Sequence, residues 1–145
     1  MKDREWILGH IPHQGAMCLL DQVLDWDSIG VRCSTRAHLS NANPLRSEGR
    51  LSAVCGIEFA AQAMAVHGAL CAAKSAATRQ GGYLVSLRNV MLHCERLDDI
   101  EEGLVATANR LGGDEVTLLY DFSLHAGSRA LITGRATIVT NPGAL

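Results

Sequence analysis

The sequence predicts an α+β fold in which an antiparallel sheet of about six strands wraps around one long helix. The central segment, residues 53–74, is rich in Ala and Gly and is too long for a strand. Segments with strand-like patterns lie on both sides of it and are separated by turn residues. A single long helix among so many strands excludes a doubly wound α/β fold, because helices and strands alternate in that class.

The first elements are short. Residues 3–9 predict a helix that ends at Gly9, and Pro12 then forces an extended or turn conformation. Residues 19–26 predict a strand, with one face formed by Leu20, Leu24 and Trp26. Residues 30–39 predict a half-buried antiparallel strand, whose inward positions are Val31, Cys33, Thr35, Ala37 and Leu39. His38 falls on the polar face of this strand, where we expect it to be solvated.

Residues 40–51 are polar and predict a loop before the long helix. We expect the helix to run from about Ala53 to about Lys74, with Ser52 as its N-cap. Its many small residues would make it thin enough for a curved sheet to approach closely: Gly56, Ala60, Ala61, Ala63, Ala65, Gly68, Ala69, Ala72 and Ala73. Gly81 and Gly82 then predict a turn.

The rest of the chain predicts strands at about residues 83–96, 104–111, 115–125 and 129–140. The sequences Gly112-Gly113-Asp114 and Ala126-Gly127-Ser128 predict hairpin turns. Residues 1–145 contain no repeat or linker, so we expect one domain. This order of elements is that of the hot-dog fold.

Composition limits the possible functions. The net charge is −2, aromatic residues make up 4% of the chain and no basic run occurs, which argues against a nucleic-acid binder. The long helix carries Glu58, Gln62 and His67, so it is a poor membrane span. No apolar signal-peptide core follows the N-terminus, and we expect a cytoplasmic protein.

The sequence indicates neither a metal site nor a cofactor. The 5 cysteines are scattered and form no C-x-x-C pair, which is typical of reduced thiols rather than of zinc ligands or a disulfide framework. Cys55 could have a lowered pKa at the helix N-terminus, but no histidine lies near it in sequence and we expect an inert thiol. No Gly-rich phosphate loop is present.

Glu58 is the residue most indicative of function. It lies among Ala, Gly and apolar residues suited to burial, where a carboxylate loses hydration and needs a partner or a purpose. Desolvation raises the pKa of a carboxyl group toward the range of acid–base catalysis near neutral pH. Gln62 follows at i+4 on the same helical face. The alternative is that Glu58 only interacts favourably with the positive end of the helix dipole, while its carboxylate lies in water.

Most of the 6 histidines have structural interpretations. His67 lies nine residues after Glu58, about 180° around the helix, and so faces away from it. We expect His93 in the core or in an interface and His125 in a turn. His10 and His13 have i, i+3 spacing, but the intervening proline spoils a helical metal pair.

Two segments carry a family resemblance. Residues 11–24 read IPHQGAMCLLDQVL and residues 56–63 read GIEFAAQA. The first resembles the opening motif of the FabA/FabZ-like 3-hydroxyacyl-acyl-carrier-protein dehydratases, a Leu-Pro-His run before a Leu-Leu-Val-Asp-Arg strand. The second resembles their Glu-Ala-Met-Ala-Gln helix, whose glutamate is catalytic. The resemblance covers nearly the whole chain and looks closest to the dehydratase-like hot-dog proteins of aryl-polyene gene clusters.

One loop departs from this family. Its housekeeping members carry a catalytic histidine in a Gly-His-Phe-Pro-Gly loop, at the position that Pro44 occupies here, and residues 41–50 contain no histidine. Either another histidine completes the pair with Glu58, or the chain is not a standard dehydratase. His13 is the histidine that matches the family motif, and Pro12 fixes the backbone before it. The alternative role for His13 is structural, with its ring bonded to backbone.

The resemblance implies dehydration of a 3-hydroxyacyl thioester on acyl carrier protein to the 2-enoyl thioester, in fatty-acid- or polyene-type biosynthesis. His13 and Glu58 would be the acid–base pair. Gly56 would polarise the thioester carbonyl through its N–H at the helix N-terminus, unless it serves only helix–sheet packing. Gln62 would orient the reacting groups or bind the substrate. We expect a His13 ring nitrogen within about 7 Å of a Glu58 carboxylate oxygen, so that both can contact one substrate.

Two other functions stay open. In a thioesterase the same carboxylate would activate water and release a free acid. In a catalytically silent partner subunit the fold would be kept while a related protein performs the chemistry. The missing loop histidine favours the silent subunit, and the retained Glu58 and Gln62 disfavour it.

The expected partners follow from the fold and the resemblance. The substrate would arrive on an acyl carrier protein, linked through phosphopantetheine. We expect a homodimer, because an isolated sheet has an edge strand to protect, with a heteromer containing a related dehydratase as the alternative.

Overall fold

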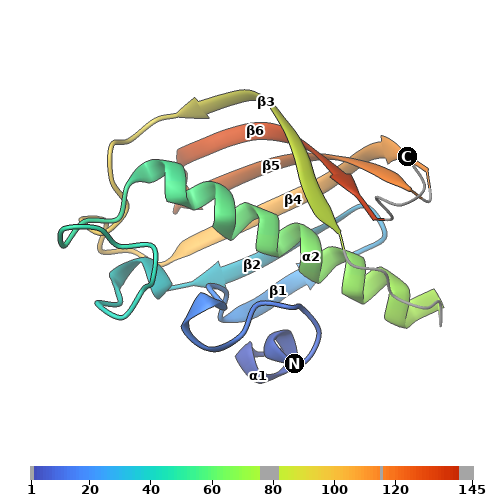
Figure 1. Cartoon of the computed structure of the whole chain (residues 1–145), viewed down its shortest axis with the longest axis horizontal. Helices are drawn as coiled ribbons and strands as arrows, with labels where there is room; N and C mark the ends of the chain where they lie inside the picture. The colour runs from blue at the N-terminus through green and yellow to red at the C-terminus, as the bar shows by residue number, and fades with distance from the viewer. Residues whose placement is uncertain (1, 76–81, 115, 141–145) are drawn as a thin grey trace.

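An antiparallel sheet curls around one long helix, as the sequence predicts (Figure 1). The computed structural model describes residues 2–75, 82–114 and 116–140. Within these residues the strand order is β1-β2-β4-β5-β6-β3. The helices are α1 (Arg4–Leu8) and α2 (Gly56–Ser75), and the strands are β1 (Gln22–Trp26), β2 (Gly30–Thr35), β3 (Tyr83–Leu92), β4 (Leu104–Gly113), β5 (Thr117–Ala126) and β6 (Arg129–Val139).

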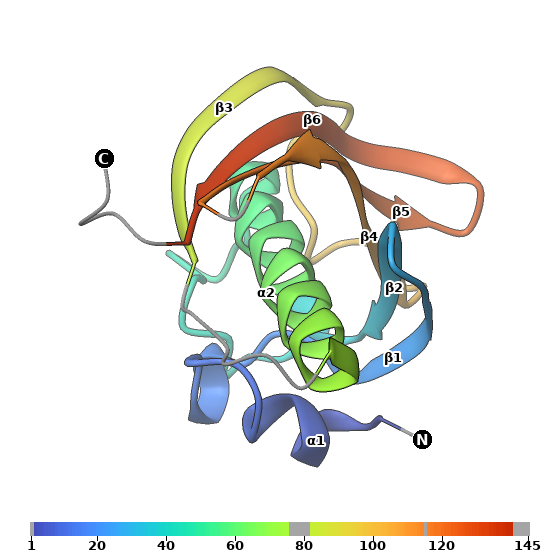
Figure 2. The same ribbon diagram turned by 90° about the vertical axis from the view of Figure 1, so that its right-hand side faces the viewer.

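The core lies between α2 and the concave face of the sheet (Figure 2). The small residues Ala60 and Ala63 are fully packed there, so sheet residues such as Ala106 can approach the helix closely. The helix is apolar and long enough to span a membrane by length and composition, but 56% of that window is buried inside the protein, as expected of a core helix. α1 lies on the side of α2 that the sheet leaves open (Figure 2).

The start of α2 differs from the prediction. A 3-10 turn, Ala53–Cys55, precedes the helix, and the Ser52 side chain makes no capping hydrogen bond. The backbone of Ser52 is instead extended and forms an isolated bridge with Arg96. Backbone acceptors take the place of a serine cap: the Ala53 N–H donates to the Glu95 carbonyl and the Cys55 N–H to the Ser52 carbonyl, both at 3.0 Å, while the Gly56 N–H donates to the Ala53 carbonyl.

The first strand is shorter than predicted, and one face of it was assigned wrongly. Leu20 is buried, but it lies before β1. Leu24 is 42% exposed because the register shifts between Val23 and Asp25, and a bulge changes which side chains point inward.

The prediction that His38 is solvated is also wrong. β2 ends at Thr35, and a 3-10 turn follows at Ala37–Leu39, so the alternation stops and His38 turns inward. Its side chain is fully buried, with Nε2 2.9 Å from the Ile100 carbonyl oxygen. Desolvation lowers the pKa of His38, so this histidine is a neutral structural residue.

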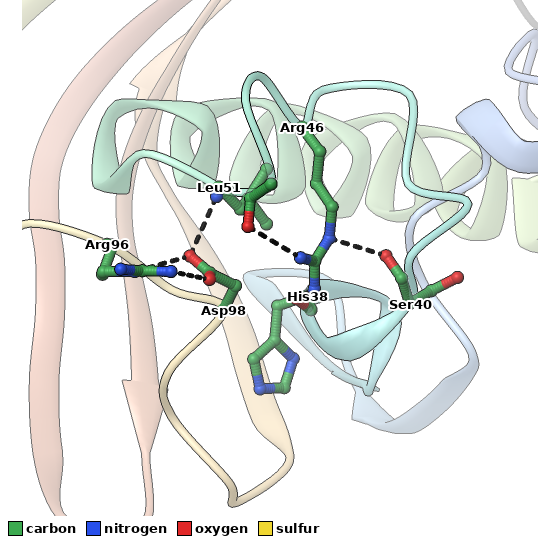
Figure 3. A network of polar contacts seen from close by, with 7 residues as sticks. His38, Ser40, Arg46, Leu51, Arg96 and Asp98 are labelled. Carbon is green, nitrogen blue, oxygen red and sulfur yellow. Dashed lines mark hydrogen bonds and ion pairs between the residues drawn. The ribbon is translucent and has the colours of Figure 1, made fainter.

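The loop in which the family carries its histidine is organised here by an arginine (Figure 3). Arg46 donates to the carbonyl oxygens of Ser40, Gly49 and His38 at 2.8, 3.3 and 3.2 Å. At the end of the loop Asp98 pairs with Arg96 and accepts a 2.9 Å bond from the Leu51 N–H (Figure 3). The loop therefore has an internal scaffold in place of a catalytic side chain.

The remaining predicted elements agree with the structure apart from their ends. β3 stops at Leu92, four residues earlier than predicted, while the other strand ends lie within about two residues of the expected positions. β5 pairs antiparallel with both β4 and β6, which confirms the two predicted hairpins. Gly127 has a φ of 58° in the second turn, whereas Gly112 and Gly113 lie at the end of β4 and pair with Leu119 and Leu118, so they are strand residues and not turn residues. Gly81 lies outside the described residues, so the turn predicted there is not described.

Candidate active site

The segment that carries His13 is clamped from several directions. The Arg4 guanidinium, on α1, donates to the carbonyl oxygens of Gly15 and Cys18 at 2.8 and 2.9 Å. The Gln14 amide donates to the carbonyl oxygen of Leu8 at 2.7 Å. These bonds connect α1 to the turn before β1, so the backbone on both sides of His13 is fixed.

Gln62 ties this segment to α2. Its side chain is fully buried, with Oε1 accepting from the Leu19 N–H at 2.8 Å and Nε2 donating to the Met17 carbonyl at 2.7 Å. Nε2 also lies 3.2 Å from Oε1 of Glu58. All these partners are internal, so the geometry suits a residue that orients Glu58 and does not suit direct contact with a substrate.

His13 and Glu58 face each other within one chain. His13 Nε2 lies 3.3 Å from Glu58 Oε1, with the two side chains 26% and 35% exposed. The expectation that they lie within about 7 Å is confirmed. An ionised carboxylate can only accept, so Nε2 carries the hydrogen of this contact. The sequence places these residues 45 positions apart, and only the turn before β1 brings them together.

The pKa of Glu58 moves opposite to the expectation. The hydrogen bond from His13 lowers the pKa and outweighs desolvation, which raises it; the bond from Gln62 lowers it further. Glu58 is therefore ionised at neutral pH, next to a histidine N–H. Burial alone predicts a raised pKa, because the local sequence does not show which groups stabilise the ionised form of Glu58.

The pair lies at a mostly apolar cavity of about 270 Å³. The helix contributes Ala61, Ala65 and Gly68 to its wall, and the sheet contributes residues including Leu118 and Ile138. A proton-exchanging pair beside an apolar cavity is suited to a substrate with an apolar chain and a reactive polar end.

Gly56 does not line this cavity. A Cβ at Gly56 would collide with side chains of the sheet, those of Ile132 and Leu124. Its N–H already donates to the Ala53 carbonyl. The structure thus shows the packing role of Gly56, and it leaves the predicted carbonyl-polarising role without geometric support.

The other histidines lie away from this pair. His10 stacks on Trp6 with ring centroids 3.9 Å apart. His93 is exposed on the single chain, so it is not a core residue, and His125 lies in β5 and not in the predicted turn. His67 is buried and bonds to the Tyr120 hydroxyl at 2.7 Å, on the face of α2 turned away from Glu58 as predicted. Tyr120 also lines the cavity, and nothing in the local sequence around it indicated this.

The part of the chain that the structure describes offers no metal cluster and no activated thiol beside this pair. Among the described residues no group of three or more His, Cys, Asp or Glu side chains could hold a metal ion. None of the five cysteines forms a disulfide bond. The Cys55 sulfur lies 3.8 Å from the Leu45 carbonyl oxygen, a contact that does not activate a thiol.

A curved antiparallel sheet around one helix, with an acid–base pair beside the helix, defines a hot-dog protein with an enzyme-like site. Residues 7–144 match the family model ApeP-like, described as ApeP dehydratase. The chain belongs to this family, so the dehydratase resemblance is confirmed.

Solved structures support the same fold. The dehydratase heterocomplex ApeI:P from Xenorhabdus doucetiae matches with a TM-score of 0.83 and 23% identity, over 92% of this chain and 90% of that chain. A mutant thioesterase from Pseudomonas aeruginosa matches with a TM-score of 0.59 and 14% identity, over 81% and 78%. A mutant hypothetical protein from Staphylococcus aureus matches with a TM-score of 0.61 and 13% identity, over 81% of this chain and 90% of that chain. A search of curated proteins finds no match.

Proposed function

We propose that the chain dehydrates a 3-hydroxyacyl thioester, delivered on an acyl carrier protein, to the 2-enoyl thioester. The observation that carries this proposal is the 3.3 Å contact between His13 Nε2 and Glu58 Oε1 beside an apolar cavity. In the dehydratases that this chain resembles, the glutamate pairs with a loop histidine. Pro44 occupies the position of that histidine here, and His13 takes its place beside Glu58. Membership of a dehydratase family supports the reaction type.

The pair can balance the protons of the elimination. Ionised Glu58 accepts the proton from Cα, and the electron pair of that C–H bond forms the Cα–Cβ double bond. The Cβ–O bond breaks, and the hydroxyl leaves as water with the proton from His13 Nε2. His13 enters this step protonated on both ring nitrogens and leaves it as neutral imidazole. Proton transfer from Glu58 back to His13 across their contact restores the site.

The remaining residues support the pair. Gln62 orients the Glu58 carboxylate, and Arg4 holds the turn that carries His13. The carrier protein as partner and the cytoplasm as location rest on the resemblance and on the sequence.

The assembly that we propose is a dimer joined through β3. The other edge of the sheet is already covered, because the β1 residue Val23 donates its N–H to the Lys2 carbonyl at 2.9 Å. β3 is the last strand of the sheet order. It exposes large apolar side chains: Tyr83, Leu84, Val85, Leu87, Met91 and Leu92. A long apolar edge strand of this kind needs a pairing partner.

A second function is favoured by one observation. The ApeI:P structure is a heterocomplex, and a silent partner subunit would need neither the loop histidine nor a reactive pair. In that case β3 would pair with a related dehydratase instead of a second copy.

Turnover by the purified chain separates these functions. We expect it to convert a 3-hydroxyacyl carrier protein to the enoyl product without any other protein, as followed by mass spectrometry of the carrier. Product that forms only after a related dehydratase is added, and that is insensitive to Glu58→Gln in this chain, would support the silent subunit. A free acid in place of the enoyl product would indicate a thioesterase.

A further inference from the structure

We infer that Thr35, the last residue of β2, is a positioning residue for Glu58 and acts through the backbone of Leu19 and the side chain of Gln62. Thr35 does not line the cavity, so it would act without contacting the substrate. The inference rests on the proposed function, because it concerns the residue that accepts the substrate proton in the proposed elimination.

The hydroxyl of Thr35 is a feature that packing alone does not explain. The inward positions of β2 before it, Val31 and Cys33, are buried and apolar, and Thr35 continues the same row with 1% exposure. Valine has the same branched shape without the polar atom. Because a buried hydroxyl is destabilising unless it is hydrogen-bonded, its bonding partners indicate its role.

The Thr35 hydroxyl connects two backbone segments. It donates to the Leu19 carbonyl, in the turn before β1, and accepts from the Ala37 N–H at 3.0 Å, at the start of the 3-10 turn after β2. Next to this link, the Asp21 N–H donates to the Ser34 carbonyl at 2.9 Å. The end of β2 therefore fixes the position of the Leu19 backbone.

Leu19 carries this constraint to Gln62. Its N–H donates to Gln62 Oε1 at 2.8 Å, and the Met17 carbonyl accepts from Gln62 Nε2 at 2.7 Å. An N–H only donates and a carbonyl only accepts, so these two backbone groups decide which end of the amide is the oxygen. The other hydrogen of Nε2 is left for Oε1 of Glu58, at 3.2 Å. In a reversed amide, an oxygen would face the carboxylate and repel it.

This chain of bonds places a donor against the ionised form of Glu58. The bond from Gln62 is one of the causes that lower the pKa of Glu58, after the larger effect of His13. Leu19 and Gln62 are fully buried, like Thr35, so solvent does not compete for the bonds that join them. Side chains held in this way supply the fixed geometry that a general base needs.

The first test removes the hydroxyl and keeps the shape. In Thr35→Val the Leu19 carbonyl loses its partner, and the Gln62 amide is no longer held in one orientation. We expect kcat to fall about tenfold, the effect of one uncharged hydrogen bond, while KM stays within about twofold. The pKa of Glu58, followed by carbon-detected NMR, should rise. Thr35→Ser restores the hydroxyl and should return both values to those of the wild type.

The matched control is Val31→Ala. It shortens another buried side chain of the same row of β2 and lowers stability without removing a polar group. Urea unfolding measures the loss of stability in both variants, and Val31→Ala should leave kcat and the pKa of Glu58 unchanged. The other titratable residues that line the cavity, His13, Tyr83 and Tyr120, are the same in every variant.

A measurement on the wild type needs no variant. The Thr35 hydroxyl proton should be visible by NMR and exchange slowly with water, because it is buried and donated to the Leu19 carbonyl. Exchange as fast as that of solvent-exposed hydroxyls overturns the inference. So does a Thr35→Val variant with unchanged kcat and pKa, or one whose effects Val31→Ala reproduces or Thr35→Ser does not reverse. A wild type without turnover, in which Thr35→Val still raises the pKa of Glu58, overturns the proposed reaction and leaves the positioning of Glu58 by Thr35 intact.

Discussion

Replacing Glu58 by glutamine changes the proton chemistry of the site and almost nothing in its shape. The amide can keep contacts with His13 and Gln62, which lie 3.3 and 3.2 Å from Oε1. It cannot accept the substrate proton. General acid–base catalysis contributes roughly 10²–10⁴-fold, so turnover should fall at least a hundredfold, about 2.7 kcal/mol in activation free energy.

The effect of Glu58→Gln on stability should be small. Glu58 is 35% exposed, so solvent screens its ion pair with His13, and pairs of this kind contribute about 0–1 kcal/mol. For a domain of this size that corresponds to a shift in Tm of at most about 5 °C. Loss of turnover with a nearly unchanged melting curve would therefore indicate a chemical role.

Steady-state turnover and differential scanning calorimetry on one preparation provide the assay. Glu102→Gln, which removes an exposed carboxylate outside the cavity, is the control and should leave both values unchanged. Turnover of Glu58→Gln within about threefold of the wild type would refute the reasoning. Glu58 would then act only through its interaction with the positive end of the helix dipole, which stabilises a protein by about 0.3–1 kcal/mol.

The other predictions concern the partners of Glu58 and the proposed dimer. His13→Asn should abolish turnover and raise the pKa of Glu58, because the bond from His13 is the main cause of its lowered value; carbon-detected NMR titration measures it. This lowered pKa also makes stability depend on pH. A carboxylate whose pKa is lowered by folding stabilises the folded state above its unfolded pKa, and this contribution is lost as the pH falls through the folded pKa. The wild type should therefore lose more stability in acid than His13→Asn. Gln62→Leu should lower the unfolding free energy by about 2–4 kcal/mol in urea, because it leaves buried backbone groups unpaired; a loss below about 0.5 kcal/mol would contradict this. Val85→Lys should turn the proposed dimer into monomer in light scattering, while Leu24→Lys, at another exposed apolar position, should not.

The sequence by itself determined the features that depend on neighbouring residues. Small residues without strand alternation predicted α2, and alternating or Gly-bounded segments predicted the strands, because helical and strand periods are local properties of the chain. Glu58 was identified in the same way, as a carboxylate in a run of residues suited to burial. The family motif indicated His13 as its candidate partner.

Only the tertiary structure decided how these residues act on one another. The lowered pKa of Glu58 depends on a histidine 45 positions away, and the internal bonds of Gln62 depend on the turn that ends at Leu19. A bulge in β1 and the early end of β2 decided the exposure of Leu24 and the burial of His38. These outcomes follow from strand register, packing and the closure of long loops, which distant segments determine together and no local period encodes.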